Sequence, residues 1–455
     1  MKSTVSSSID IQWFLPARLL LAALFLASPL TGPAGAATFH VDVNWTGAQS
    51  GTTNQPFQTI KAAVDAANAN GAADTIYVAD GTYKSLLNSG YEDFGAGGIA
   101  ISQPANQGDT ALYGGYAGWV SGTTFDWTAP SRVPRSTVID LTGAGARAFN
   151  RTGSGEINWM VTVDGFTFQN ASHSGDGGAV GGAAVSHTGW MINNCLFTNN
   201  VTAGKGGAVY AYGQWQFSVA ITNCDFVGNT GGDAGALYIP NTGSFSGANK
   251  CRVVDSRFVN NIATNSGGAL CLYSAGGQPE VRSCDFRGNR AGTNASGGAV
   301  LALSSGAPGD MIAFVGCRFV GNSAKNGGAV YSQQTGARSF GLSFTNCLLT
   351  GNTATNYTVY HDGWIVTTTG DPYGVDMTHC TVAGNTGGGI KSWWYYDATF
   401  GYGGNVRLRD TIVATNGGFG VYYDYSSYVG GNRNPAILFS DVWGHATNYG
   451  EDAVA

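Results

Sequence analysis

Residues 194–210 read NCLFTNNVTAGKGGAVY, and residues 283–300 read SCDFRGNRAGTNASGGAV. Both stretches hold a small residue, an apolar residue two positions later, an asparagine three positions after that, and then a Gly-Gly-Ala-aliphatic run. Similar stretches recur every 28 to 33 residues between Cys195 and Thr411. One such unit cannot bury its apolar face alone, so repeats at this period stack on one another. The sequence therefore predicts a solenoid.

The elements within each repeat have the length of strands. Each covers about five residues, and no helical periodicity separates one element from the next. Charged residues make up only 11% of the chain, which argues against long soluble helices. Strands that recur once per coil pair in parallel with those of the next coil. The predicted fold class is therefore all-β, a single-stranded parallel β-helix.

An outward column provides a test of this register. The position between the small and the apolar residue holds Asp225, Arg257, Asp285 and Arg318 in four successive coils. Neighbouring coils lie about 4.8 Å apart, so opposite charges alternate along this column. We expect these four residues to be stacked in register on the outer surface.

Two other columns are predicted to be structural. An asparagine in a turn can bond its own backbone and the amide of the next coil. The asparagine column holds Asn200, Asn229, Asn261, Asn289, Asn322, Asn352, Asn385 and Asn416.

The column of small residues favours free, buried thiols over disulfides. It holds Cys195, Cys224, Ser256, Cys284, Cys317, Cys347, Cys380 and Thr411. A disulfide between Cys251 and Cys271 stays open. No spacing suggests a metal site, so none is predicted.

The segments before the repeats divide the chain. Residues 1–36 resemble a signal peptide, with Lys2 and Arg18, a short apolar run and a small-residue cleavage site after residue 36 or 37. We predict a strand–helix–strand cap over residues 37–83, with strands at 38–43 and 74–79, a helix at 56–67 and a turn at 80–83. Irregular coils with long loops are expected at 84–160, and regular coils at 161–455.

Some of these residues resemble a known family. Phe226-Val227-Gly228-Asn229 and Gly297-Gly298-Ala299-Val300 are similar to the repeats of the polymorphic outer membrane proteins of chlamydiae. The opening, residues 56–60 and 80–83, looks like the start of secreted β-helix proteins of the pectate-lyase-like class. The resemblance implies a right-handed helix, a secreted or cell-surface location, and adhesin-like or polysaccharide-related work.

Candidate functional residues lie where the repeat varies. Outward positions beside Val330, Val359, Ile390 and Val421 carry aromatic and polar groups, and aromatic rings suit the flat faces of sugars. The alternative is ordinary packing of tyrosines beneath a loop. The candidate ligand-binding residues are Tyr331, Tyr360, His361, Trp393 and Tyr422.

The same face offers a catalytic alternative. Asp362 and Asp424 would lie two coils apart, about 9–10 Å, near the upper limit for the two carboxylates of an inverting glycosidase. Lys391 could instead abstract a proton from a uronic acid, with a bound cation such as calcium assisting. No cofactor is predicted outside that lyase alternative.

These observations point to an exported, monomeric protein that works outside the cell. The formal net charge of −6 gives no basic footprint for nucleic acid, and no stretch after residue 36 is apolar enough for a membrane-spanning helix. The favoured function is adhesin-like binding of a polysaccharide or cell-surface polymer through the aromatic face. The alternative is a polysaccharide lyase or a glycoside hydrolase.

Overall fold

A computed structural model describes most of the chain after residue 34. The described residues are 35–102, 108–152, 159–182, 188–213, 219–242, 251–274, 278–304, 310–335, 340–364, 374–395, 405–423 and 436–451. Within these ranges the chain forms a parallel β-solenoid, so the predicted fold class is confirmed. No helix in these ranges is long and apolar enough to cross a membrane.

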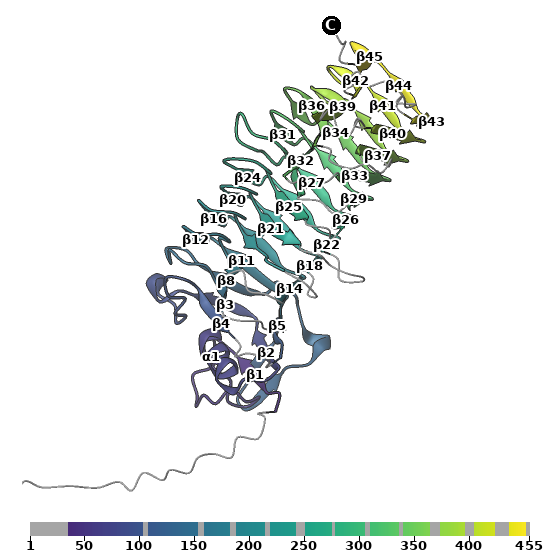
Figure 1. Cartoon of the computed structure of the whole chain (residues 1–455). Coiled ribbons are helices and arrows are strands. Elements are labelled where there is room, and N and C mark those ends of the chain that lie inside the picture. Colours follow the sequence, from purple (N-terminus) through teal and green to yellow (C-terminus); the bar gives the residue numbers. More distant parts are fainter. Residues whose placement is uncertain are drawn as a thin grey trace, which may run out of the picture. The chain divides into compact units, whose positions relative to one another are not determined.

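Three long parallel sheets build the solenoid, and each coil adds one strand to each sheet (Figure 1). Sheet 1 contains β1 (Thr38–Val41), β2 (Asp74–Ala79), β5 (Thr110–Tyr116), β10 (Trp159–Asp164), β14 (Thr188–Asn193), β18 (Val219–Thr222), β22 (Arg252–Val254), β26 (Glu280–Arg282), β29 (Asp310–Val315), β33 (Phe340–Thr345), β37 (Gly374–Thr378), β40 (Asn405–Arg409) and β43 (Ala436–Leu438).

Sheet 2 follows sheet 1 after a sharp bend in each regular coil. It contains β3 (Gly81–Lys84), β8 (Thr137–Asp140), β11 (Phe166–Gln169), β15 (Leu196–Thr198), β19 (Asp225–Val227), β23 (Arg257–Val259), β27 (Asp285–Arg287), β30 (Arg318–Val320), β34 (Leu348–Thr350), β38 (Thr381–Ala383), β41 (Ile412–Ala414) and β44 (Asp441–Trp443).

Sheet 3 closes each coil. It contains β4 (Ile99–Ser102), β9 (Phe149–Thr152), β13 (Val180–Gly182), β17 (Val209–Tyr210), β21 (Leu237–Thr242), β25 (Leu270–Ser274), β28 (Val300–Ser304), β32 (Val330–Gln334), β36 (Tyr357–Trp364), β39 (Gly388–Tyr395), β42 (Phe419–Tyr423) and β45 (Thr447–Glu451).

Short elements lie between sheets 2 and 3 and in the first coils. They are β12 (Ser172–His173), β16 (Val201–Thr202), β20 (Thr230–Gly231), β24 (Ile262–Ala263), β31 (Ser323–Ala324), β35 (Thr353–Ala354), the antiparallel pair β6 (Gly118–Ser121) and β7 (Thr124–Asp126), and the 3-10 turns η1 (Leu86–Asn88) and η2 (Ala129–Ser131).

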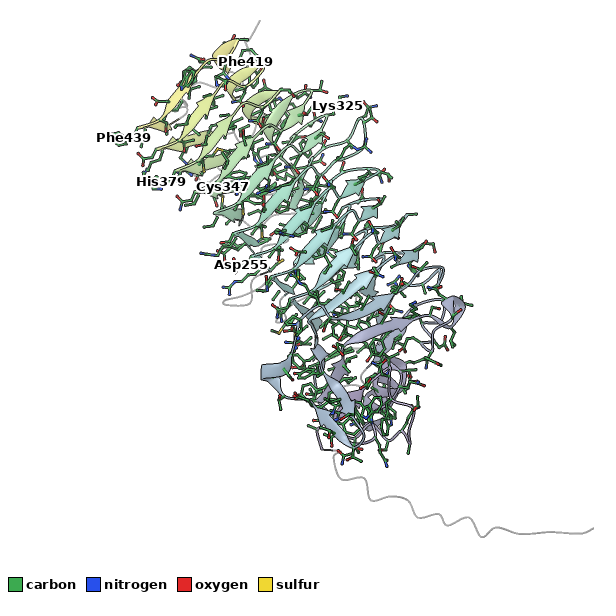
Figure 2. All side chains as sticks on the ribbon, turned by 180° about the vertical axis from the view of Figure 1, so that it is seen from behind. Asp255, Lys325, Cys347, His379, Phe419 and Phe439 are labelled. Carbon is green, nitrogen blue, oxygen red and sulfur yellow. The ribbon has the colours of Figure 1, made fainter. Side chains whose placement is uncertain are left out.

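A left-handed residue makes the bend between sheets 1 and 2. The residue before the small column has a φ of 50° at Asp255, 54° at His379 and 51° at Phe439. These three residues lie along one edge of the stack (Figure 2). A second left-handed residue precedes each asparagine, for example Asn260 with a φ of 54° and Gly288 with 62°. Asn, Asp and Gly tolerate this conformation best, which explains their frequency at both bends.

The glycine pair of each repeat brings neighbouring coils close together. Gly297 has a φ of 73°, which L residues rarely adopt. A Cβ atom at Gly298 would lie 2.1 Å from the carbonyl oxygen of Gly328 in the next coil. The first glycine therefore supplies the turn, and the second allows the close approach.

The apolar column stacks aromatic rings through the centre. Phe226, Phe258 and Phe286 lie face to face with ring centroids 4.8 Å apart and planes within 7° of parallel. The same stack continues to Phe168 at one end and Phe319 at the other. Parallel pairing in register produces this geometry, because each ring lies above the same position of the next coil.

The asparagine column forms a continuous buried ladder. The Oδ1 atom of Asn289 accepts from the backbone N–H of Asn261 at 3.0 Å and from its Nδ2 at 3.0 Å, while Nδ2 of Asn289 donates to the carbonyl of Phe258 at 2.9 Å. The pattern repeats from Asn200 to Asn416. After Asn416, His445 takes the next rung, since its Nδ1 lies 3.2 Å from the N–H of Asn416 and its Nε2 lies 3.0 Å from the carbonyl of Val413.

The outward charged column has the predicted register. Asp225 is paired with Arg257, Arg257 with Asp285, and Asp285 with Arg318 in successive strands of sheet 2. Arg257 Nε bonds Asp225 Oδ1 at 2.8 Å. Asp285 instead bonds Arg287, two residues along its own strand.

All eight cysteines of the chain are free and buried. Those in the small column lie with their sulfur atoms near backbone carbonyls of the bend, as Cys347 Sγ does at 3.4 Å from the carbonyl of Thr345. Cys251 and Cys271 are not joined.

The first coils differ from the predictions in two details. The helix α1 spans Ile60–Asn70, so it begins four residues later than expected. Thr59 caps it, and the carboxylate of Glu92 accepts from the N–H groups of Ile60 and Lys61 at 2.8 and 2.7 Å. Residues 81–83, predicted as a turn, belong to strand β3, because they pair with β8 in sheet 2.

Candidate functional site

The outer side of sheet 3 changes character along the stack. The strands that carry the predicted site, β36 and β39, have eight residues each, whereas β25, β28 and β32 have five. Strands β32, β36, β39 and β42 pair in register, so Tyr331, Tyr360, Lys391 and Tyr422 form one outward column. Gln333, Asp362 and Trp393 form a second outward column two residues further on.

The first outward column is packed more tightly than expected. Although these side chains point out of the solenoid, Tyr238, Leu301, Tyr331 and Tyr422 are each only 7% exposed. Tyr238, Cys271, Leu301 and Tyr331 form a second apolar cluster with Ala234, outside the main core. This outward column is therefore buried at most of its positions. Tyr360 and Lys391 are half-buried.

Lys391 lies within a cage of tyrosine rings. Its Nζ atom is 4.6 Å from the ring centroid of Tyr422, 5.2 Å from that of Tyr360 and 5.8 Å from that of Tyr357. The ring of Tyr357 contacts both of the other rings, and Phe419 packs on Tyr422 at 5.3 Å. The negative faces of the rings stabilise the ammonium group.

Asp362 lies next to this cage and is held by a tyrosine. Tyr331 Oη donates to Asp362 Oδ2 at 2.7 Å. Burial raises the pKa of Asp362, while the hydroxyl of Tyr331 and the charge of Lys391 oppose the rise. Burial, together with the bonded carboxylate, raises the pKa of Tyr331, so its hydroxyl stays protonated at neutral pH.

His361 does not belong to the outward face. Its side chain points inward and is fully buried, because it lies between Tyr360 and Asp362 on a strand whose side chains alternate. Its Nδ1 lies 2.7 Å from Ser332 Oγ, and its ring contacts Phe340 edge to face at 5.2 Å. Burial lowers the pKa of His361 to about 4. Its placement among ligand-binding residues is therefore corrected.

Of the two remaining predicted residues, the structure describes Trp393 but not Asp424. Trp393 is paired with Asp362 in the register of sheet 3 and is half-buried. Asp424 lies outside the described residues. The structure therefore brings together Tyr331, Tyr360, Asp362, Lys391 and Tyr422, with Trp393 beside them.

Tyr357 belongs to the cage but is absent from the sequence prediction. It occupies the register position of Gly328, the second glycine of the repeat, in a coil that reads Asn-Tyr-Thr-Val instead of Gly-Gly-Ala-Val. The sequence signal for Tyr357 was a bulky aromatic residue at a position that holds glycine in other coils. Phe419 occupies the same register position two coils later and was not predicted either.

The described charged groups of this face are held by neighbouring tyrosines. Asp362 is bonded to Tyr331, and the ammonium group of Lys391 is surrounded by rings at 4.6 to 5.8 Å. What the face offers is half-buried rings, one carboxylate and one ammonium group on a rigid sheet. Those groups suit recognition by stacking and hydrogen bonding.

Comparison with known families identifies the repeats. The family model described as the Chlamydia polymorphic membrane protein (Chlamydia_PMP) repeat matches residues 194–212, 255–273 and 316–333. Each match runs from the bend before sheet 2 through the glycine pair into sheet 3. No match was found among curated proteins or among solved structures.

These matches bear on where the protein works. Repeats of this kind on a parallel β-helix indicate a surface-exposed, autotransporter-like protein, with an outer-membrane or surface location. The matched segments belong to the scaffold, and none of them includes β36 or β39. The chain is a parallel β-solenoid that carries Chlamydia polymorphic membrane protein repeats.

Proposed function

We propose that this protein is an adhesin-like binder of glycans or other surface polymers, and that the outer side of β36 and β39 is its binding face. The observation that carries the proposal is the register of these two strands, which places Tyr360, Asp362 and Trp393 side by side in a half-buried patch. Tyr331 and Tyr422 form a tightly packed base on either side.

The chemistry of the patch fits a sugar polymer. The flat apolar face of a sugar ring stacks on an aromatic ring, and its hydroxyl groups bond carboxylates. The interlocked cage around Lys391 and the Tyr331–Asp362 bond fix the patch before a ligand arrives, which lowers the entropic cost of binding.

The proposal includes export. Residues 1–36 have the composition of a signal peptide, and the repeats are of a surface family. We expect the N-terminus of the exported chain to be Ala37 or Thr38, which mass spectrometry of the secreted protein would measure.

Binding to an array of immobilised glycans tests the face. We expect the double variant Tyr360→Ala/Trp393→Ala to lose about tenfold or more in affinity for the best wild-type ligand, because two stacking rings are removed. Tyr273→Ala, a half-buried tyrosine of the same sheet in an earlier coil, is the matched control. Unchanged binding by the double variant would refute the proposed face.

An activity assay tests the enzymatic alternative in the same samples. Pectate, alginate and neutral glycans are incubated with the wild type, and unsaturated or reducing ends are measured. We expect no release. Release that is abolished in Asp362→Ala or Lys391→Ala would replace the binding function with a lyase or a hydrolase.

A further inference from the structure

A second aromatic site lies far from the first in the sequence, in the early coils. A pocket of about 460 Å³ opens on the outer side of sheet 1, over strands β2 and β5. Tyr77, Tyr113 and Tyr116 form its floor, and Arg132 and Pro134 form its wall. Its volume is within the usual range of small-molecule sites, about 300 to 1,000 Å³.

The floor follows from strand alternation. On β2, Ile76 and Val78 point into the core and are fully buried, so Tyr77 between them points outward. Tyr113 is its register partner on β5. The ring centroids of Tyr77 and Tyr113 are 6.0 Å apart, and those of Tyr77 and Tyr116 are 4.9 Å apart. Three tyrosine rings from adjacent strands thus form a platform, in which Tyr113 is tilted by 36° and Tyr116 by 63° to the ring plane of Tyr77.

The wall is part of the excursion over residues 117–135 and is anchored at several points. The N–H of Val133 donates to the carbonyl of Gly115 at 2.7 Å, and Trp127 Nε1 donates to the carbonyl of Thr53 at 3.1 Å. The N–H of Trp119 donates to Asp42 Oδ2 at 2.6 Å. These bonds hold the excursion against the first coils, so the pocket is formed without a ligand.

Arg132 is oriented by its own bonds. Its Nε donates to the carbonyl of Gly114 at 2.7 Å, and its Nη2 donates to the backbone and side chain of Asp164 at 2.9 and 2.5 Å. The guanidinium carbon lies 5.8 Å from the ring centroid of Tyr113 and 5.7 Å from that of Tyr116. Its positive charge is therefore balanced by Asp164, and its guanidinium group is fixed over two rings of the platform.

The hydrogen-bonding groups of the pocket are available. Among the described residues, the hydroxyl groups of Tyr77, Tyr113 and Tyr116 have no hydrogen-bond partner, and neither does Nη1 of Arg132. Burial raises the pKa of Tyr113 and Tyr116, so both hydroxyls are neutral at physiological pH. The pocket thus combines flat apolar faces with neutral donors and acceptors, and it has no net charge to select an anion.

We propose that this pocket binds an uncharged hexose residue of a glycan chain. A hexose offers an apolar face for the tyrosine platform and several hydroxyl groups for the tyrosine hydroxyls and Arg132 Nη1. An acidic sugar would meet a guanidinium that Asp164 already neutralises. The pocket is on sheet 1 in the early coils, whereas the face proposed above is on sheet 3, so this inference does not rest on that face. Two separate contacts to one polymer would increase avidity.

The test uses the full exported chain on an array of neutral and acidic oligosaccharides, followed by calorimetry with the strongest neutral ligand. We expect Tyr77→Ala/Tyr113→Ala to weaken binding of that ligand about tenfold or more, since two stacking surfaces are lost. Tyr77→Phe/Tyr113→Phe keeps the rings and should lose less. Near-ultraviolet circular dichroism checks that each variant is folded.

The double variant Tyr360→Ala/Trp393→Ala separates the two proposals. If the pocket binds independently, calorimetry of this variant still shows the site that Tyr77→Ala/Tyr113→Ala removes. The inference is overturned if the wild type binds no neutral glycan, if it prefers acidic sugars, or if the Tyr77→Ala/Tyr113→Ala variant binds as well as the wild type.

Discussion

The interior of the solenoid and the outer side of sheet 3 are built from the same coils but follow different rules. Inside, Phe258 stacks on Phe226 and Phe286 at the same 4.8 Å, and each asparagine makes the same bonds as its neighbours. Outside, the same register brings together Leu301, Tyr331, Tyr360 and Lys391.

The difference shows what each surface must satisfy. An interior side chain contacts its counterpart in the next coil, so identical residues stack best and a change in one coil disturbs two neighbours. An outer side chain needs only to fit its immediate neighbours and solvent. The outer side therefore has room for variation, and the proposed binding residues lie there.

The largest effect should come from breaking the interior ladder. Asn289→Ala removes the acceptor of two buried donors on Asn261, the backbone N–H and Nδ2. Two unsatisfied donors cost about 4 kcal/mol together. We expect a loss of this size in the free energy of unfolding, measured by chemical denaturation.

Asn265→Ala is the control for the ladder, because Asn265 is exposed in the neighbouring coil. It should change the stability by less than about 0.5 kcal/mol. Equal losses in the two variants would show that the ladder contributes nothing specific.

A smaller effect should appear at His361, whose side chain is fully buried on the inner side of sheet 3. Because burial lowers the pKa of His361 to about 4, the folded state prefers the neutral ring. The contribution of the neutral His361 ring to the free energy of unfolding is complete above pH 6.5. It is lost as the pH falls through 4, and the loss is at most about 3 kcal/mol. We expect His361→Gln to flatten the dependence of stability on pH between 6.5 and 4.

His379→Gln is the matched control, since the side chain of His379 is 57% exposed. It should leave the acid dependence as in the wild type. An unaltered pH profile in His361→Gln would contradict the assigned environment of His361.

The smallest effect should come from the cage on the outer side. Lys391→Met keeps the apolar stem but removes the charge from the three tyrosine rings. The expected loss is about 1 kcal/mol, measured by thermal unfolding. Lys84→Met, at an exposed lysine, should be neutral. A variant as stable as the wild type would mean that the ammonium group gains nothing from the cage.

The repeat columns were predictable because the same type of residue recurs at the same position in many successive repeats. The register of Asp225 and Arg257 and the strand positions followed from this redundancy. The environment of individual side chains did not follow from this redundancy. Nothing local distinguishes His361, which is buried, from Asp362, which is half-exposed, except the alternation of one strand. The burial of Tyr331 depends on neighbours from adjacent coils and on Ala234, which no pattern within its own repeat predicts.

The ladder from Asn200 to Asn416 also has a consequence for how the chain can change in length. Every rung makes the same bonds in the same direction, and the final rung is completed by an imidazole. Duplicating or deleting one whole coil would therefore leave each remaining rung with an equivalent partner. The order of side chains on the outer side would change at the same time. In a protein of this construction, unequal recombination between repeats gives new surfaces without new cores.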